Sequence, residues 1–130
     1  MGFTIFRTTV TILICCFLVM LFLLPSAILT RFTEQADALL ESAENALLSD
    51  DTDAAESYCA ALYELMREQM PVLDRFLNHE SVDALHARIV IADFALRAGD
   101  PGTTAEALAE ARSILVCLEA IEHFSWNNLL

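Results

Sequence analysis

An uncharged apolar run near the amino terminus constrains this chain more than any other feature. It extends from Thr8 to Leu29 and lies between Arg7 and Arg31. At about 1.5 Å per residue, a helix over this run is roughly 33 Å long, which is enough to cross the ~30 Å hydrocarbon core of a bilayer. The sequence therefore predicts a membrane anchor, residues 1–30, followed by a water-facing domain, residues 31–130.

Three processed alternatives fit the run less well than an uncleaved span. A signal peptidase site after Ala27 would place Pro25 at the third position before the cut, where a small residue is needed. A lipoprotein signal needs a small residue before the modified cysteine, but Ile14 precedes Cys15. The first residues are similar to a type IV pilin start, with Arg7 where those proteins carry an acidic residue.

The flanking charges favour one orientation of this single-pass anchor. The amino terminus and Arg7 stand on one side and Arg31 alone on the other, which favours a cytoplasmic amino terminus and an extracytoplasmic domain. The lipid bilayer is then the partner of residues 8–29. Pro25 lies near the outer end of the span, where it can kink the helix or mark its end.

The domain is strongly acidic. Residues 32–130 hold all nineteen acidic side chains and five arginines, with no lysine, which gives a formal charge of −14. Such a surface repels nucleic acid and anionic headgroups, so neither is an expected partner. A basic protein face remains possible, and the simplest interpretation is a solvated surface that keeps the domain soluble.

The spacing of apolar residues predicts an all-α fold. Glycine and proline are scarce, and apolar residues recur at intervals of three and four from Phe32 onward. We expect an antiparallel bundle of about four helices, built as two helical hairpins. The third helix, about Val82 to Ala98, is apolar on more than half of its circumference, because Val90, Ile91 and Phe94 lie beside its core positions. It should therefore be central to the bundle.

Several local signals refine this expectation. Asp50–Asp53 should cap the second helix, and Thr103 or Thr104 should open the fourth. Pro71 predicts a kink or restart of the second helix near Met70. Residues 78–81 should form a short corner. A faint repeat at an offset of fifty pairs Ala55–Glu56 with Ala105–Glu106.

One constellation could bind a metal ion. His79, Asp83 and His86 are spaced at i, i+4 and i+7 and so share one face of a helix. The strong form of this motif is HExxH, and here Asp83 replaces its second histidine. The favoured interpretation is that His79 and Asp83 cap and pin the corner between two helices, so no metal or cofactor is expected.

The residue types that catalysis usually needs are not gathered in this sequence. There is no glycine-rich phosphate loop, no lysine and no serine elbow, so we do not expect an enzyme. Cys59 and Cys117 would be able to pair outside the cytoplasm, but two separately buried thiols are favoured. The apolar tail, residues 124–130, should fold back over the end of the bundle or dock on a partner.

From Phe76 onward the chain resembles an uncharacterised bacterial family of small membrane-anchored helical proteins with a domain of unknown function. The resemblance rests on the corner His79-Glu80-Ser81-Val82-Asp83, the apolar helix to Arg97 and the tail Asn127-Asn128-Leu129-Leu130. His86 stands where relatives are expected to carry a charged residue. The resemblance implies an anchor, an orientation and a helical fold, but no reaction.

These observations predict a non-catalytic, membrane-tethered interaction or accessory module of the cell envelope. Its expected partner is another membrane or envelope protein. The first alternative is an extracytoplasmic domain that senses a ligand or metal through the His79 corner. The second is an adaptor of inverted topology that faces the cytoplasm.

Overall fold

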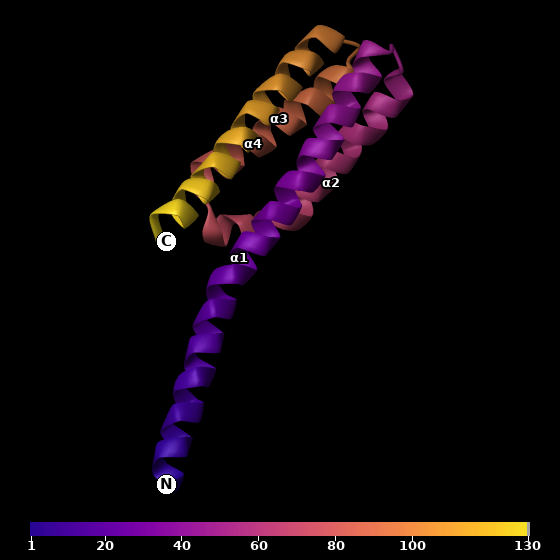
Figure 1. The fold of residues 1–130 in the computed structure, drawn as a ribbon. Helices are drawn as coiled ribbons and strands as arrows, with labels where there is room; N and C mark the ends of the chain where they lie inside the picture. Colours follow the sequence, from indigo (N-terminus) through magenta and orange to yellow (C-terminus); the bar gives the residue numbers. More distant parts are fainter. Residues whose placement is uncertain (130) are drawn as a thin grey trace.

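The computed structural model describes the backbone of residues 1–129 and the side chains of residues 1–24 and 26–121. Within these residues the chain forms four helices and no strand, which confirms the all-α prediction (Figure 1). The helices are α1 (Gly2–Leu48), α2 (Thr52–Phe76), α3 (His79–Arg97) and α4 (Pro101–Leu129).

Helix α1 contributes both the apolar run and the first helix of the bundle. Its amino-terminal half extends away from the other helices, and its second half packs among them (Figure 1). Every side chain up to Leu24 is exposed, whereas Leu29 is 8% and Phe32 1% exposed. The helix does not end at Pro25. The predicted division between residues 30 and 31 thus falls inside one helix and stays a prediction.

By length and composition, α1 is the one helix among the described residues that could cross a membrane. Almost none of its apolar half is buried inside the structure, which separates it from an ordinary core helix. The hydroxyls of Thr8, Thr9 and Thr11 donate hydrogen bonds of 2.9, 2.9 and 2.8 Å to the carbonyls four residues earlier. These polar groups are therefore satisfied within the helix itself.

The four helices form a ring in which each contacts two neighbours. α1 packs against α2 and α4, and α3 packs against α2 and α4. The inward faces meet in one core, formed mainly by Phe32, Ala36, Leu40, Ala43, Ala55, Cys59, Leu62, Met66, Leu73, Val82, Leu85, Ile89, Ala92, Leu108, Ala111 and Leu115. Because a ring has no central member, the prediction that α3 is central is wrong. Its surplus apolar residues, Val90, Ile91 and Phe94, are 39%, 39% and 74% exposed.

The two hairpins turn in the same way. After α1, the amide of Asp51 donates to the carbonyl of Ala46 at 2.9 Å, and Asp50 has a φ of 55°. After α3, the amide of Asp100 donates to the carbonyl of Ala95 at 2.9 Å, and Gly99 has a φ of 76°. Both turns are Schellman motifs, in which a left-handed residue lets the chain reverse while the last helical carbonyls stay bonded.

An aspartate caps the helix that follows each turn. The carboxylate of Asp51 accepts from the amide of Ala54, and that of Asp100 from the amide of Thr103, both at 3.1 Å. Helix α4 therefore begins at Pro101, two or three residues before the predicted start at Thr103 or Thr104. The equivalent turn residues are 49 positions apart, so the predicted repeat exists with an offset of 49 instead of fifty.

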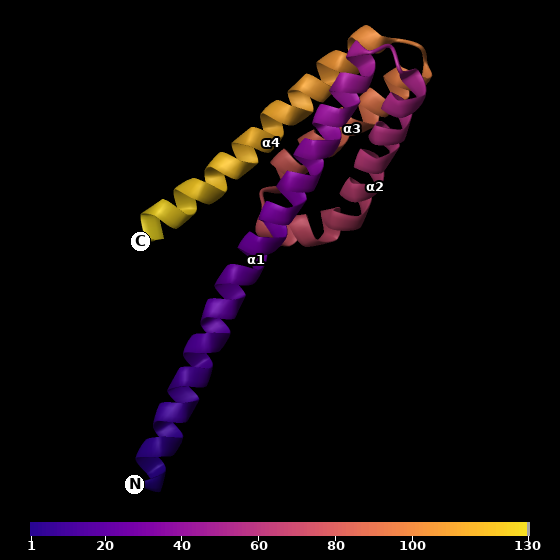
Figure 2. The same cartoon turned by 45° about the vertical axis from the view of Figure 1, so that its right-hand side comes forward.

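The connection between α2 and α3 is shorter than predicted. Only Leu77 and Asn78 lie outside the helices, and the side chain of Asn78 caps α3 by accepting from the amide of Glu80 at 3.0 Å. Pro71 does not restart α2, which continues to Phe76 and turns across the end of the bundle (Figure 2). The backbone of α4 remains helical to Leu129, so the predicted fold-back of the tail is not formed. Whether the tail side chains are buried concerns residues 124–130, whose side chains lie outside the described residues.

The ring arrangement predicts very different effects for two isoleucines of α3. Ile89 is 1% exposed and Ile91 39% exposed. In a fragment that begins at Ile28, Ile89→Ala should cost about 2–5 kcal/mol of unfolding free energy, because it leaves a cavity in the core. The matched Ile91→Ala should cost roughly 1 kcal/mol or less. Denaturant titration followed by circular dichroism measures both, and equal losses would contradict the ring.

The cap of α4 predicts a pH dependence. Two hydrogen bonds from Thr103, through its hydroxyl (2.6 Å) and then its amide, lower the pKa of Asp100 below its usual range. A lowered pKa means that the folded state prefers the carboxylate. The stabilisation is therefore present above the unfolded pKa of about 4 and is lost as the pH falls through the folded value.

The matched variant is Asp100→Asn, which keeps a capping oxygen but does not titrate. We expect the melting temperature of the wild-type protein to fall more steeply than that of Asp100→Asn when the pH is lowered from 5 to below about 3. Parallel curves over this range would show that the cap does not contribute. Asp100→Ala should melt lower than both at neutral pH.

Candidate functional site

The three predicted ligand residues lie on α3 but contact different neighbours. His79 is the first residue of α3, and its Nδ1 lies 3.3 Å from Oδ1 of Asp74 on α2. Asp83 is exposed, and the ring of His86 packs beside that of Tyr63, with 5.9 Å between the ring centroids. Among the described residues, no group of three or more His, Cys, Asp or Glu side chains is arranged to hold a metal ion.

The corner role predicted for these residues is seen in part. His79 does link α2 to α3 through Asp74. The residue that caps α3, however, is Asn78 and not Asp83. An asparagine directly before a helical segment is itself a strong capping signal. The capping residue was therefore identifiable in the sequence, one position before His79.

A groove between α2 and α3 is the most distinctive surface of the bundle, and we call it the α2–α3 groove. It has a volume of about 470 Å³ and is lined by Ala60, Tyr63, Glu64, Val90, Asp93, Phe94 and Arg97. Phe94 is 74% exposed, more than any other aromatic residue described after residue 24. The rim charges are paired, Glu64 with Arg67 at 2.8 Å and Asp93 with Arg97 at 3.3 Å. The groove thus presents apolar surface between paired charges.

The prediction that Val90 and Phe94 flank the core missed this groove. A helix advances about 100° per residue, so Phe94 lies about 140° around α3 from the core residue Ile89. Because Ile89 faces the core, this angle places Phe94 on the outward side of α3. The signal was therefore present in the sequence, but choosing the inward direction required the packing of all four helices.

The buried polar atoms of this interface are incompletely satisfied. Nδ1 of His86 and one carboxylate oxygen of Asp93 are buried without a hydrogen-bond partner among the described residues. Beneath the groove, burial and then the negative charges of Asp93 and Glu56 together raise the pKa of Cys59 to about 11. Cys59 therefore remains a thiol at neutral pH and is a poor nucleophile.

The cysteines do not form the predicted arrangement of two buried thiols. Cys59 is buried, but Cys117 is exposed, and both are free. Helix α4 presents Cys117 outside the core, whereas α2 places Cys59 inside it. Cys117 is consequently the thiol of the bundle that a reagent in solution can reach.

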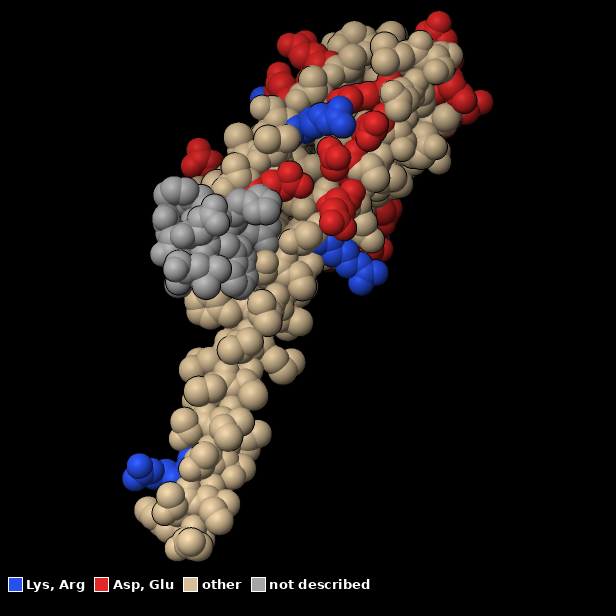
Figure 3. All heavy atoms as spheres, in the orientation of Figure 1, with Lys and Arg blue, Asp and Glu red and all other residues tan. Residues whose placement is uncertain are grey.

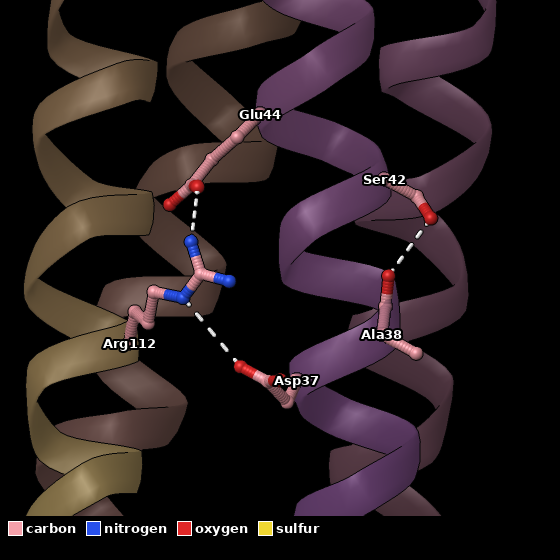
Figure 4. A network of polar contacts seen from close by, with 5 residues as sticks. All are labelled: Asp37, Ala38, Ser42, Glu44 and Arg112. Carbon is pink, nitrogen blue, oxygen red and sulfur yellow. Dashed lines mark hydrogen bonds and ion pairs between the residues drawn. The ribbon is translucent and has the colours of Figure 1, made fainter.

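On the opposite side of the bundle, ion pairs join α1 to α4. Arg112 of α4 donates from Nη1 to Oε2 of Glu44 at 2.7 Å, and its Nε lies 3.5 Å from Oδ1 of Asp37 (Figure 4). Figure 3 shows this face, where acidic side chains surround an arginine and the long lower part of α1 is nearly free of charge. A half-buried guanidinium fork holds two carboxylates well because it donates several hydrogen bonds in one plane.

The repeat makes this difference between the two sides explicit. At an offset of 49, Arg112 corresponds to Tyr63, Asp37 to His86, and Glu44 to Asp93. One side therefore joins its helices by ion pairs, while the equivalent positions on the other hold an aromatic pair and a carboxylate above an open groove. This departure from the repeat identifies the α2–α3 groove as the candidate functional site.

The corner predicts distinct effects for two adjacent substitutions. Asn78→Ala removes a helix cap and should cost about 1 kcal/mol of unfolding free energy, whereas His79→Ala removes only an exposed ion pair and should cost less. The zinc content of the purified protein should be the same before and after His79→Ala. Stoichiometric zinc that disappears with His79 would instead support a metal site.

Comparison with known families gives one match. The family described as Domain of unknown function (DUF4363) matches residues 24–129, from the end of the apolar run through the bundle. No curated protein and no solved structure matches the chain. The expected resemblance to an uncharacterised family is confirmed over most of the sequence, and the chain belongs to the DUF4363 family.

Proposed function

We propose that the protein is a non-catalytic, membrane-tethered interaction module of the cell envelope. The observation that carries the proposal is the change of surface along α1. Its side chains are apolar and exposed up to Leu24, and from Leu29 the same helix enters the core of the bundle. An exposed apolar helix of this length is favourable in a bilayer and unfavourable in water. Residues 8–29 would cross the membrane and hold the bundle at its surface.

The orientation in this proposal follows from the flanking charges. Arg7 and the amino terminus would face the cytoplasm, and Arg31 would face outward with the domain. The acidic surface supports this arrangement only indirectly, because acidic residues contribute little to topology.

The α2–α3 groove is the proposed binding surface for another membrane or envelope protein. Phe94 and Val90 offer apolar contact, and the ion pairs of the rim lie on either side of them. Because residues 32–130 carry a formal charge of −14, we expect a segment with an apolar side chain next to lysine or arginine. Tethering both proteins to one membrane raises their effective concentration, so modest affinity suffices.

The absence of catalysis is part of the proposal. Cys59 has a pKa raised to about 11, which keeps it in the less nucleophilic thiol form. His79 is paired with Asp74, and His86 packs against Tyr63. The alternative of a ligand- or metal-sensing domain at the His79 corner has less support, because these side chains turn to different neighbours.

A photo-crosslinking amino acid at Phe94 of the full-length chain tests the proposed surface in its native cells. We expect a crosslink to one membrane or envelope protein, identified by mass spectrometry. The same probe at Leu48, which is 86% exposed on α1, is the matched control and should not capture that protein. Adding Val90→Glu to the Phe94 probe should abolish the crosslink. Identical products from both probe positions would rule out the groove as the binding surface.

The same cells report the orientation. A membrane-impermeant maleimide should label the exposed Cys117 in intact cells, while the buried Cys59 should react only after denaturation. Labelling of Cys117 only after lysis would place the domain in the cytoplasm. Loss of the protein from the membrane fraction on carbonate washing would contradict the tether itself.

A further inference from the structure

The connection between α2 and α3 lies at the end of the bundle from which the apolar half of α1 emerges. We call residues 75–79 the α2–α3 corner. Figures 1 and 2 both show it beside α1 at this junction. Leu29, the last residue of the apolar run, and Leu73, near the end of α2, belong to the same buried core. Because α2 runs antiparallel to α1 and its end turns across the bundle, the residues after Leu73 lie near the level at which the apolar run ends (Figure 2).

The side chains of the corner do not suit a position in open water. The ring of Phe76 is 54% exposed, and Arg75 beside it is also exposed. Leu77 packs against the core and so holds the corner in place. An apolar ring next to an arginine suits the interface of a bilayer, where the ring reaches the upper acyl chains and the guanidinium reaches the phosphates.

The charges of the molecule are arranged to permit this contact. The corner carries Arg75, and two acidic residues flank it: Asp74, whose Oδ1 lies 3.3 Å from Nδ1 of His79, and Glu80 in the first turn of α3. The two acidic turns, with Asp50, Asp51 and Asp100, lie at the opposite end of the bundle (Figure 1). The corner can therefore approach the phosphates of a zwitterionic lipid without bringing the acidic turns near them.

We infer that the α2–α3 corner lies in the headgroup layer of the bilayer that α1 crosses, with Phe76 among the upper acyl chains and Arg75 at the phosphates. The inference rests on the proposed membrane tether and adds a second point of contact with the lipid. A rod held at one point can tilt, whereas contact through α1 and the corner fixes the inclination of the bundle. The α2–α3 groove would then face partners at a defined height and angle.

Nitroxide labels on the full-length chain in phosphatidylcholine vesicles test this inference. The four native cysteines are replaced by alanine, and single cysteines are introduced as Phe76→Cys, Leu48→Cys and Leu18→Cys. Leu48 is 86% exposed at the acidic end, and Leu18 is in the middle of the apolar run. Arg75→Cys provides a second reading of the corner should the variant at Phe76 fold poorly, and circular dichroism verifies each variant.

Collisions with oxygen and with a water-soluble nickel chelate report the environment of each label. We expect the label at Phe76 to be severalfold less accessible to nickel than the label at Leu48, and more accessible to oxygen. The label at Leu18 should be protected from nickel. A corner as accessible to nickel as Leu48, with Leu18 protected, would overturn the inference and leave the tether intact.

Two further outcomes are equally decisive. Protection of the corner from both reagents would mean that protein covers it instead of lipid, and the inference would fail. Accessibility of Leu18 to nickel would mean that the apolar run is not in the bilayer, and the proposed tether would fail together with the corner contact.

Discussion

Helix α1 runs from Gly2 to Leu48 with no loop between its two halves, and the rest of the structure depends on this continuity. A loop between anchor and domain would leave carbonyls and amides that need water, and it would let the domain move independently. Here the helix that leaves the apolar run is the helix that supplies Phe32, Ala36 and Leu40 to the core. Packing of the bundle and placement of the apolar run therefore both depend on one continuous helix.

Repetition explains how so small a chain closes its bundle. Each hairpin ends its first helix with a Schellman turn and starts its second with an aspartate cap, and the local sequence repeats as Ala43-x-x-Ala46-Leu47 and Ala92-x-x-Ala95-Leu96. Small alanines at the buried positions allow close approach of the helices near both turns. The two hairpins then complete a ring that buries one continuous core. The two hairpins differ in their contacts: ion pairs join α1 to α4, whereas α2 and α3 form an aromatic groove. This difference is the feature that suggests a specific role for the groove.

Much of this fold was accessible from local chemistry. Spacing of three and four from Phe32 onward correctly predicted helices that share one core, and the aspartates after Ser49 correctly predicted the cap of α2. The start of α4 was misplaced although Asp100-Pro101 carries an N-cap followed by proline at the first helical position, which is a favoured pair. The exposed position of Phe94 and Val90 was a different kind of error. A helix that is apolar nearly all round has no unique inward direction until its neighbours are placed, so the groove could not be found from one segment alone.

The unbroken helix also couples the domain to the bilayer in rotation. Each residue turns the helix by about 100° and lifts it by about 1.5 Å, so one residue inserted between Leu24, which is exposed, and Leu29, which enters the core, would rotate the groove by about a quarter turn around the axis of α1. Seven inserted residues would return it to within about 20° of its direction, but about 10 Å further from the membrane. The number of residues between the span and the bundle therefore sets the direction in which the groove faces around α1, as well as its height above the membrane. Both determine how a partner fixed in the same bilayer meets the groove.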